Sequence, residues 1–113
     1  MTRIDRVLSR EEIKKLRKEY GNFFKITADI ARGILIVGCE LHADGETVLL
    51  DEGSNQDDVW GGGIFISEKT VDTTAILNLR PNRGNSSMDI LDPVRRKSFI
   101  DLVRKLFAVL WET

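Results

Sequence analysis

The sequence predicts an α+β fold: a small, mostly antiparallel sheet of about four strands, flanked by an N-terminal helix and a long C-terminal helix. Apolar residues recur at helical spacing near both ends of the chain, and apolar and polar residues alternate between them. Short turn sequences separate the alternating segments. With 113 residues the chain has the usual size of one domain, so we expect a single domain over residues 1–113.

The first element is predicted to be a helix over residues 10–20. Ser9 and Glu12 have the spacing of a capping box, and Gly21 supplies a C-terminal stop. The apolar positions between them form one helical stripe: Ile13, Leu16 and Tyr20. The charged residues on the other faces are expected to form a solvated surface rather than a nucleic-acid contact.

An antiparallel hairpin is predicted next. Residues 24–30 alternate with a period of two, and the turn 31–33 ends in glycine before a second strand that runs to His42. One face of this second strand is apolar throughout. The opposite face starts apolar and ends with Glu40 and His42, so we expect one end of the sheet to be covered and the other open.

The middle of the chain is less regular. The segment 44–52 fits a short helix capped by Asp44, although Gly45 disfavours a helix and Thr47 and Val48 also suit a strand; we expect the helix. The glycine triplet 61–63 permits a tight bend or a mobile loop. It does not follow a strand and open a helix, so it does not predict a phosphate-binding loop.

The last third is predicted to contain a strand over 73–80 and a helix from Pro93 to about Trp111, with Asp92 as its N-cap. Pro81 and the turn-rich residues after it separate the two. The helix carries a broader apolar surface than one small sheet requires. This surface either packs entirely within the monomer or forms a homodimer interface.

Composition excludes several classes of protein. Hydrophobic residues make up 42% and charged residues 31% of the chain, and the formal charge of −1 gives no overall field for a polyanion. The longest apolar run, 34–37, is far below the roughly 20 residues of a membrane span. The single Cys39 cannot form an internal disulfide, and no signal peptide is recognisable. We therefore expect a cytoplasmic protein with no nucleic-acid or membrane partner.

Glu40, His42 and Asp44 form the first candidate site, because a continuing strand would place all three on one face. A histidine between carboxylates can transfer protons near neutral pH, so these are the candidate catalytic residues. The same groups could instead bind a divalent cation or form structural hydrogen bonds. With at most three ligands and no Cys/His framework, no metal site is predicted, and no cofactor is expected.

Arg80, Asn85 and Asn78 form the second candidate, an anion-binding group in which a guanidinium holds a carboxylate or phosphate. Gln56 could add a hydrogen bond, and Trp60 could form a wall. Alternatively, Arg80 pairs with a carboxylate such as Glu40, and Asn85 satisfies backbone groups of its loop. If the strands 34–42 and 73–80 are parallel neighbours, the polar ends of the two candidates can meet in one site, whereas antiparallel neighbours would place Arg80 towards Ile34 and weaken this combination.

Three blocks, 38–44, 53–61 and 78–85, together resemble an uncharacterised family of short prokaryotic proteins, and the resemblance extends over most of the chain. It implies a shared architecture and a shared polar site without naming a reaction. Gly63 and Gly45 depart from the family pattern, in which a polar residue and an alanine are expected at these positions.

Two functions follow from these observations. The leading hypothesis is binding of a small polar or anionic ligand at one end of the sheet, with acid–base chemistry at His42. The alternative is a non-enzymatic, homo-oligomeric interaction module that uses the C-terminal helix.

Overall fold

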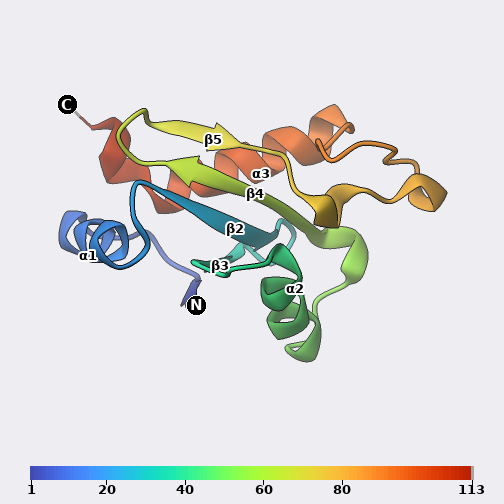
Figure 1. Ribbon diagram of the computed structural model, residues 1–113, viewed down its shortest axis with the longest axis horizontal. Coiled ribbons are helices and arrows are strands. Elements are labelled where there is room, and N and C mark those ends of the chain that lie inside the picture. The colour runs from blue at the N-terminus through green and yellow to red at the C-terminus, as the bar shows by residue number, and fades with distance from the viewer. Residues whose placement is uncertain (113) are drawn as a thin grey trace.

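The computed structural model describes residues 1–112 and centres on a five-stranded antiparallel sheet with the order β1-β3-β2-β4-β5 (Figure 1). The strands are β1 (Thr2–Ile4), β2 (Phe23–Asp29), β3 (Ile34–Val37), β4 (Val59–Phe65) and β5 (Thr70–Asp72). The predicted α+β class and the hairpin of β2 and β3 are confirmed. The sheet has one strand more than expected, because the short edge strands are too brief to give a sequence pattern.

Within residues 1–112, three α-helices accompany the sheet: α1 (Arg10–Tyr20), α2 (His42–Asp51) and α3 (Pro93–Leu106). The caps predicted for α1 and α3 are present. The Ser9 hydroxyl accepts a hydrogen bond from the Glu12 amide at 3.2 Å, and the Asp92 carboxylate accepts one from Val94 at 2.8 Å. Short 3₁₀ turns occur at Gln56–Asp58, Ile76–Asn78, Pro81–Arg83 and Ala108–Trp111.

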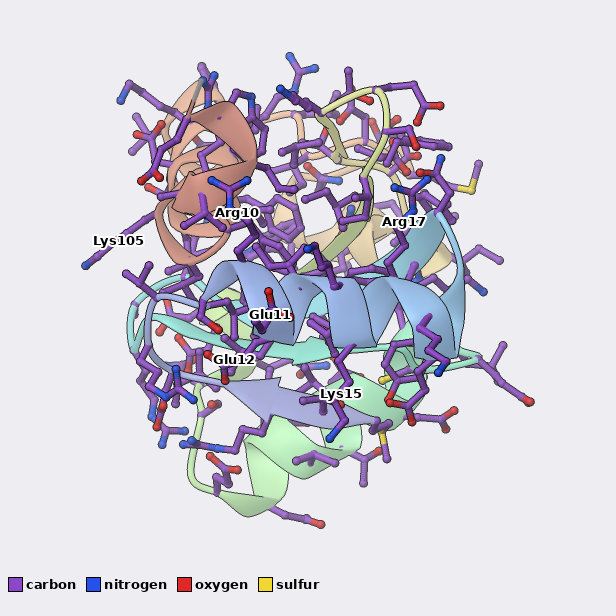
Figure 2. The ribbon with its side chains drawn as sticks, turned by 90° about the vertical axis from the view of Figure 1, so that its left-hand side faces the viewer. Arg10, Glu11, Glu12, Lys15, Arg17 and Lys105 are labelled. Atoms are coloured by element: carbon purple, nitrogen blue, oxygen red, sulfur yellow. The ribbon has the colours of Figure 1, made fainter. Side chains whose placement is uncertain are left out.

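The charged residues of α1 lie on its outer sides, as predicted. In Figure 2, Arg10 and Arg17 extend towards the C-terminal end of α3 and the β4–β5 end of the sheet, whereas Lys15 points the other way. Arg17 donates a hydrogen bond to the Ser67 hydroxyl at 2.7 Å. The opposite side of α1 buries Ile13 and Leu16 against the sheet.

The helices cover the two faces of the sheet unequally. Helices α1 and α3 pack on one face, where Phe24, Ile26, Phe99 and Val103 belong to the larger core. Helix α2 packs on the other face over a smaller core made of Ile34, Ile36, Cys39, Leu49 and Val59. Figure 1 shows α3 behind β4 and β5, and no helix in front of these two strands. One end of this second face is therefore covered and the other open, as predicted.

Helix α2 confirms the short helix expected near 44–52, but its N-cap is Leu41 rather than Asp44. Gly45 lies inside the helix for a packing reason. A Cβ on Gly45 would lie 2.7 Å from the Thr27 hydroxyl, so only glycine lets the helix approach β2 this closely. The close approach outweighs the low helix propensity of glycine.

The glycine triplet is part of β4, which corrects the interpretation of these residues as a bend or loop. A Cβ on Gly62 would lie 2.7 Å from the ring of Phe99, and one on Gly61 would lie 3.0 Å from the ring of His42. Side chains from α3 and α2 therefore pack directly on the bare backbone of β4 from opposite faces.

The predicted strand over 73–80 is wrong. Its centre forms a 3₁₀ turn, Ile76–Asn78, because the side chain of Asn78 turns back and hydrogen-bonds the backbone of Gly61. The strand expected over 34–42 is also too long. It ends at Val37, since Gly38 adopts a φ of 78° and redirects the chain.

The predicted helix from Pro93 to Trp111 ends earlier, at Leu106. The 3₁₀ turn Ala108–Trp111 follows, and its residues Val109, Leu110 and Trp111 pack against the larger core. Much of the broad apolar surface of this segment is thus used within the chain. Among residues 1–112, no helix has the length and apolar character needed to cross a membrane.

Candidate functional site

A cleft of about 460 Å³ opens on the uncovered half of the second sheet face, between the start of α2 and the loop after β5. Its walls are mostly apolar. The lining residues are Lys25, Leu41, His42, Ala43, Thr74, Ala75, Ile76, Leu77 and Met88. Leu41, Ile76 and Met88 are 60%, 78% and 50% exposed, so the rim presents large apolar side chains to solvent.

His42, the first residue of α2, supplies the most reactive group in the cleft. Its Nε2 lies 2.6 Å from the carbonyl oxygen of Gly62, and a carbonyl can only accept, so Nε2 carries the proton. The neutral ring therefore has its lone pair on Nδ1. Because Cγ and Cδ2 face Gly61, the edge formed by Nδ1 and Cε1 points away from β4. No described residue hydrogen-bonds Nδ1.

The surroundings of His42 favour its uncharged form. Burial lowers the pKa of His42 below its ordinary value, and the nearby charge of Lys25 lowers it further. The hydrogen bond to Gly62 and the charge of Asp72 act in the opposite direction without reversing the shift. At neutral pH the cleft thus contains a neutral imidazole with Nδ1 available as a hydrogen-bond acceptor or base.

Lys25 supplies the positive charge of the cleft. It lies on β2 on the same face as Thr27, and its Nζ donates a hydrogen bond to the backbone oxygen of Glu40 at 2.5 Å. No carboxylate of the described chain lies within ion-pairing distance of this ammonium group, whose remaining donors are available to an anion.

The other two candidate catalytic residues are not assembled around His42. The expectation that Glu40, His42 and Asp44 share a strand face is wrong, because β3 ends at Val37 and α2 begins at His42. Glu40 is exposed beside Lys25, and Asp44 is exposed on α2. Neither side chain hydrogen-bonds His42 among the described contacts.

Asn78 and Asn85 direct their side-chain amides to the backbone. Asn78 accepts from the Gly61 amide at 2.8 Å and donates to the Gly61 carbonyl at 2.9 Å, so its side chain pairs with β4 as a neighbouring strand would. Asn85 donates to the carbonyls of Asn78 and Asp89, both at 2.8 Å, and thereby closes the loop. This arrangement agrees with the alternative interpretation, in which asparagines satisfy loop backbone groups.

Arg80 is also directed inward. Its guanidinium donates to the carbonyls of Leu77, Gln56 and Val59, and burial lowers its pKa. Its carboxylate partner is Glu46 at 3.8 Å rather than Glu40.

The remaining candidates lie around Arg80. Trp60 is 3% exposed and packs in the larger core, with the Arg80 guanidinium 4.4 Å from its ring centroid. Gln56 is an exposed residue whose backbone carbonyl accepts a hydrogen bond from Arg80. Neither Trp60 nor Gln56 lines the cleft.

His42, Asn78 and Arg80 nevertheless share one feature, since each hydrogen-bonds the backbone of β4. Their partners are Gly62, Gly61 and Val59 respectively. The structure therefore brings these three predicted site residues to the same strand, β4. Only His42 among the three faces the cleft. The side-chain donors of Arg80 and Asn85, which were expected to bind an anion, are hydrogen-bonded to backbone carbonyls instead.

Sequence reasoning missed Lys25 and the apolar rim. Lys25 belongs to the polar face of a predicted strand, and the hairpin register, which places Ile26 opposite Val37, would have brought it near Glu40. The apolar rim has no such signal, because exposure of Ile76 and Met88 depends on the loop geometry after β5.

Together, these features define a small α+β protein with a histidine-containing apolar cleft on a half-covered sheet face. The chain belongs to the family described as "Protein of unknown function (DUF5674)", which matches residues 2–106. The predicted resemblance to an uncharacterised family is thereby confirmed. No curated protein and no solved structure matches the chain.

Proposed function

We propose that this protein binds a small carboxylate with an apolar body in the cleft beside His42. Lys25 supports the choice of an anion, since its ammonium group has no carboxylate partner in the described chain. Leu41, Ile76 and Met88 support an apolar body, because they present uncovered hydrophobic surface around the same cleft.

The orientation of His42 carries this proposal. The hydrogen bond from Nε2 to the Gly62 carbonyl fixes the tautomer and leaves Nδ1 on the ring edge that faces away from β4. A ligand hydroxyl or amide can donate to Nδ1 while its carboxylate pairs with Lys25. If the ligand is transformed, Nδ1 is the base that accepts its proton.

This proposal keeps the small anionic ligand expected from the sequence but replaces Arg80 by Lys25 as its cation. The donors of Arg80 already bind three backbone carbonyls, and releasing them would leave those carbonyls unsatisfied. The cytoplasm remains the proposed compartment, because the only cysteine, Cys39, is a buried thiol.

A panel of short aliphatic and aromatic carboxylates tests the proposal by thermal shift, followed by calorimetric titration of every compound that raises the melting temperature. We expect binding by the unmodified protein and at least a tenfold weaker affinity in Lys25→Met and His42→Gln, because one loses the ion pair and the other the Nδ1 acceptor.

The control is Lys18→Met, which removes a charge from the exposed surface of α1. It should bind as tightly as the unmodified protein. Equal affinity in all variants, or no binding by any carboxylate, would refute the proposal.

A further inference from the structure

Asp72, the last residue of β5, is a carboxylate beside the cleft without a cationic partner. It accepts hydrogen bonds from the Thr74 hydroxyl at 2.8 and 3.0 Å and from the Thr74 amide at 3.3 Å. None of the ion pairs within residues 1–112 includes Asp72. The residue is half-buried. Its carboxylate is thus held in place by one neighbour and can accept a further donor.

The strand register places Asp72 and Lys25 on either side of the same glycine. Gly63 of β4 pairs with Lys25 on β2 and with Asp72 on β5. Paired residues point to the same face of a sheet, and neighbouring strands lie about 4.8 Å apart, so the Cα atoms of Lys25 and Asp72 are separated by about 10 Å. Lys25 lines the cleft, so this face is the open one, where no helix covers β4 and β5 (Figure 1).

Two rings close the remaining sides of this area. A Cβ on Gly61 would lie 3.0 Å from the ring of His42, and one on Gly63 would lie 2.5 Å from the ring of Phe23. Both rings therefore lie over the bare backbone of β4, above two glycines that are about 6.7 Å apart along the strand. The area has a cation on one side, an anion on the other and a ring at each end.

The imidazole of His42 lies close to both charges. Burial lowers its pKa most; of the smaller effects, the charge of Lys25 lowers the pKa and the charge of Asp72 raises it. The neutral ring presents Nδ1 as an acceptor, and the Asp72 carboxylate is an acceptor as well. An ammonium group has three N–H donors, so one such group can serve both acceptors at once.

Thr74 connects this polar area to the apolar cleft. Its hydroxyl holds Asp72, and the residue lines the cleft together with Lys25 and His42. The apolar lining then continues along the chain with Ala75, Ile76 and Leu77. A ligand whose charged groups lie between Lys25 and Asp72 can therefore extend its apolar body directly into the cleft.

From this arrangement we infer that the ligand is a free α-amino acid with an apolar side chain. The inference rests on the proposed carboxylate site and adds an ammonium group to its ligand. The carboxylate pairs with Lys25, and the ammonium group donates to the Asp72 carboxylate and to Nδ1 of His42. The side chain of the amino acid fills the cleft.

Charge and length both favour an amino acid over simpler ligands. A plain carboxylate would leave Asp72 unpaired next to a second negative charge, and a plain amine would do the same to Lys25. An α-amino acid carries its two charges on adjacent carbon atoms. With contacts of about 2.8 Å at each end, it bridges an ammonium and a carboxylate that extend over the sheet from opposite sides of one residue.

Calorimetric titration of the unmodified protein with three related compounds tests the inference. These are leucine, isocaproate, which lacks the ammonium group, and isoamylamine, which lacks the carboxylate. We expect leucine to bind at least tenfold more tightly than either of the others. Phenylalanine and hydrocinnamate form a second pair of the same design with a larger apolar body, and the amino acid should again bind at least tenfold more tightly.

The outcomes separate this inference from the proposed function. Isocaproate and hydrocinnamate binding as tightly as the amino acids would overturn the inference and leave the carboxylate site standing. Isoamylamine binding as tightly as leucine would also overturn it. No binding by any of these compounds would refute the carboxylate site and the inference together.

Asp72→Asn tests the assigned partner of the ammonium group, because it removes the charge but keeps an oxygen for the Thr74 hydroxyl. This variant should bind isocaproate at least as tightly as the unmodified protein and should lose the tenfold preference for leucine. Asp101→Asn is the control, an exposed position of α3 on the other side of the sheet, and it should keep the preference. A full preference for leucine in Asp72→Asn would overturn the inference.

Discussion

Replacing Asn78 by alanine should destabilise the fold more than its place in a surface loop suggests. The side chain is fully buried, its Oδ1 accepts from the Gly61 amide, and the two N–H donors of its Nδ2 are shared among the carbonyls of Gly61, Thr73 and Met88. Alanine leaves the Gly61 amide and carbonyl without partners. Each unsatisfied buried group costs about 1–3 kcal/mol, so we expect a loss of about 3–5 kcal/mol.

This loss is a large part of the total, since a domain of this length is stable by roughly 6–17 kcal/mol. Urea unfolding followed by tryptophan fluorescence measures it, because Trp60 is buried next to Gly61 in β4. Asn82→Ala, at an exposed position of the same loop, is the control and should change little. A loss below about 1 kcal/mol for Asn78→Ala would show that the amide does not replace a strand neighbour.

Three further changes test other parts of the structure. Gly45→Ala should lower the melting temperature despite its better helix propensity, because the new Cβ would meet Thr27 at 2.7 Å; a higher melting temperature would contradict the close packing of α2. Because folding lowers the pKa of His42, the contribution of this residue to stability should be complete above the ordinary pKa of 6.5 and should fall as the pH drops below it. Urea unfolding at several pH values should show that the stability of His42→Gln depends less on pH than that of the unmodified protein. The same pH dependence in both proteins would be inconsistent with a buried neutral ring. Arg80→Met should cost about 2–4 kcal/mol and Arg80→Lys nearly as much, because the three carbonyls are bound by three separate nitrogens of the planar guanidinium and a compact ammonium group cannot reach all three positions. Full stability in the lysine variant would contradict this role.

The helices were predictable because their signals are local. Ser9 with Glu12 and Asp92 with Pro93 mark helix starts through hydrogen bonds within one turn, and both starts are where the sequence places them. The hairpin was equally predictable from the sequence, since Gly33, which adopts a φ of 72°, connects two alternating segments.

The errors arose where distant residues decide the conformation. The glycines of β4 pair with β2, and Phe99 and His42 pack closely on their bare backbone; neither the pairing nor the packing is visible in the local sequence. The segment around Asn78 has a strand-like alternation, but its buried amide bonds Gly61, which is 17 positions away, and forces a turn.

The candidate site was predictable only in part, because its residues stand out locally but their partners come from distant parts of the chain. His42 stood out as a lone histidine between acidic residues. Its actual hydrogen-bond partner, the Gly62 carbonyl, lies on β4, and the nearby charge that lowers its pKa, Lys25, lies on β2. Arg80 and Asn85 have the composition of an anion site. Burial directs their donors to the backbone instead, and composition alone cannot distinguish these two uses.

The state of the His42 ring tests the proposed cleft most directly, and the chain contains only this one histidine. A ¹⁵N-detected NMR spectrum of the ring at neutral pH should show a protonated Nε2 and an unprotonated Nδ1, and the Nδ1 signal should shift when a binding carboxylate is added. A proton on Nδ1, or a ring that does not respond to any carboxylate that stabilises the protein, would contradict the account.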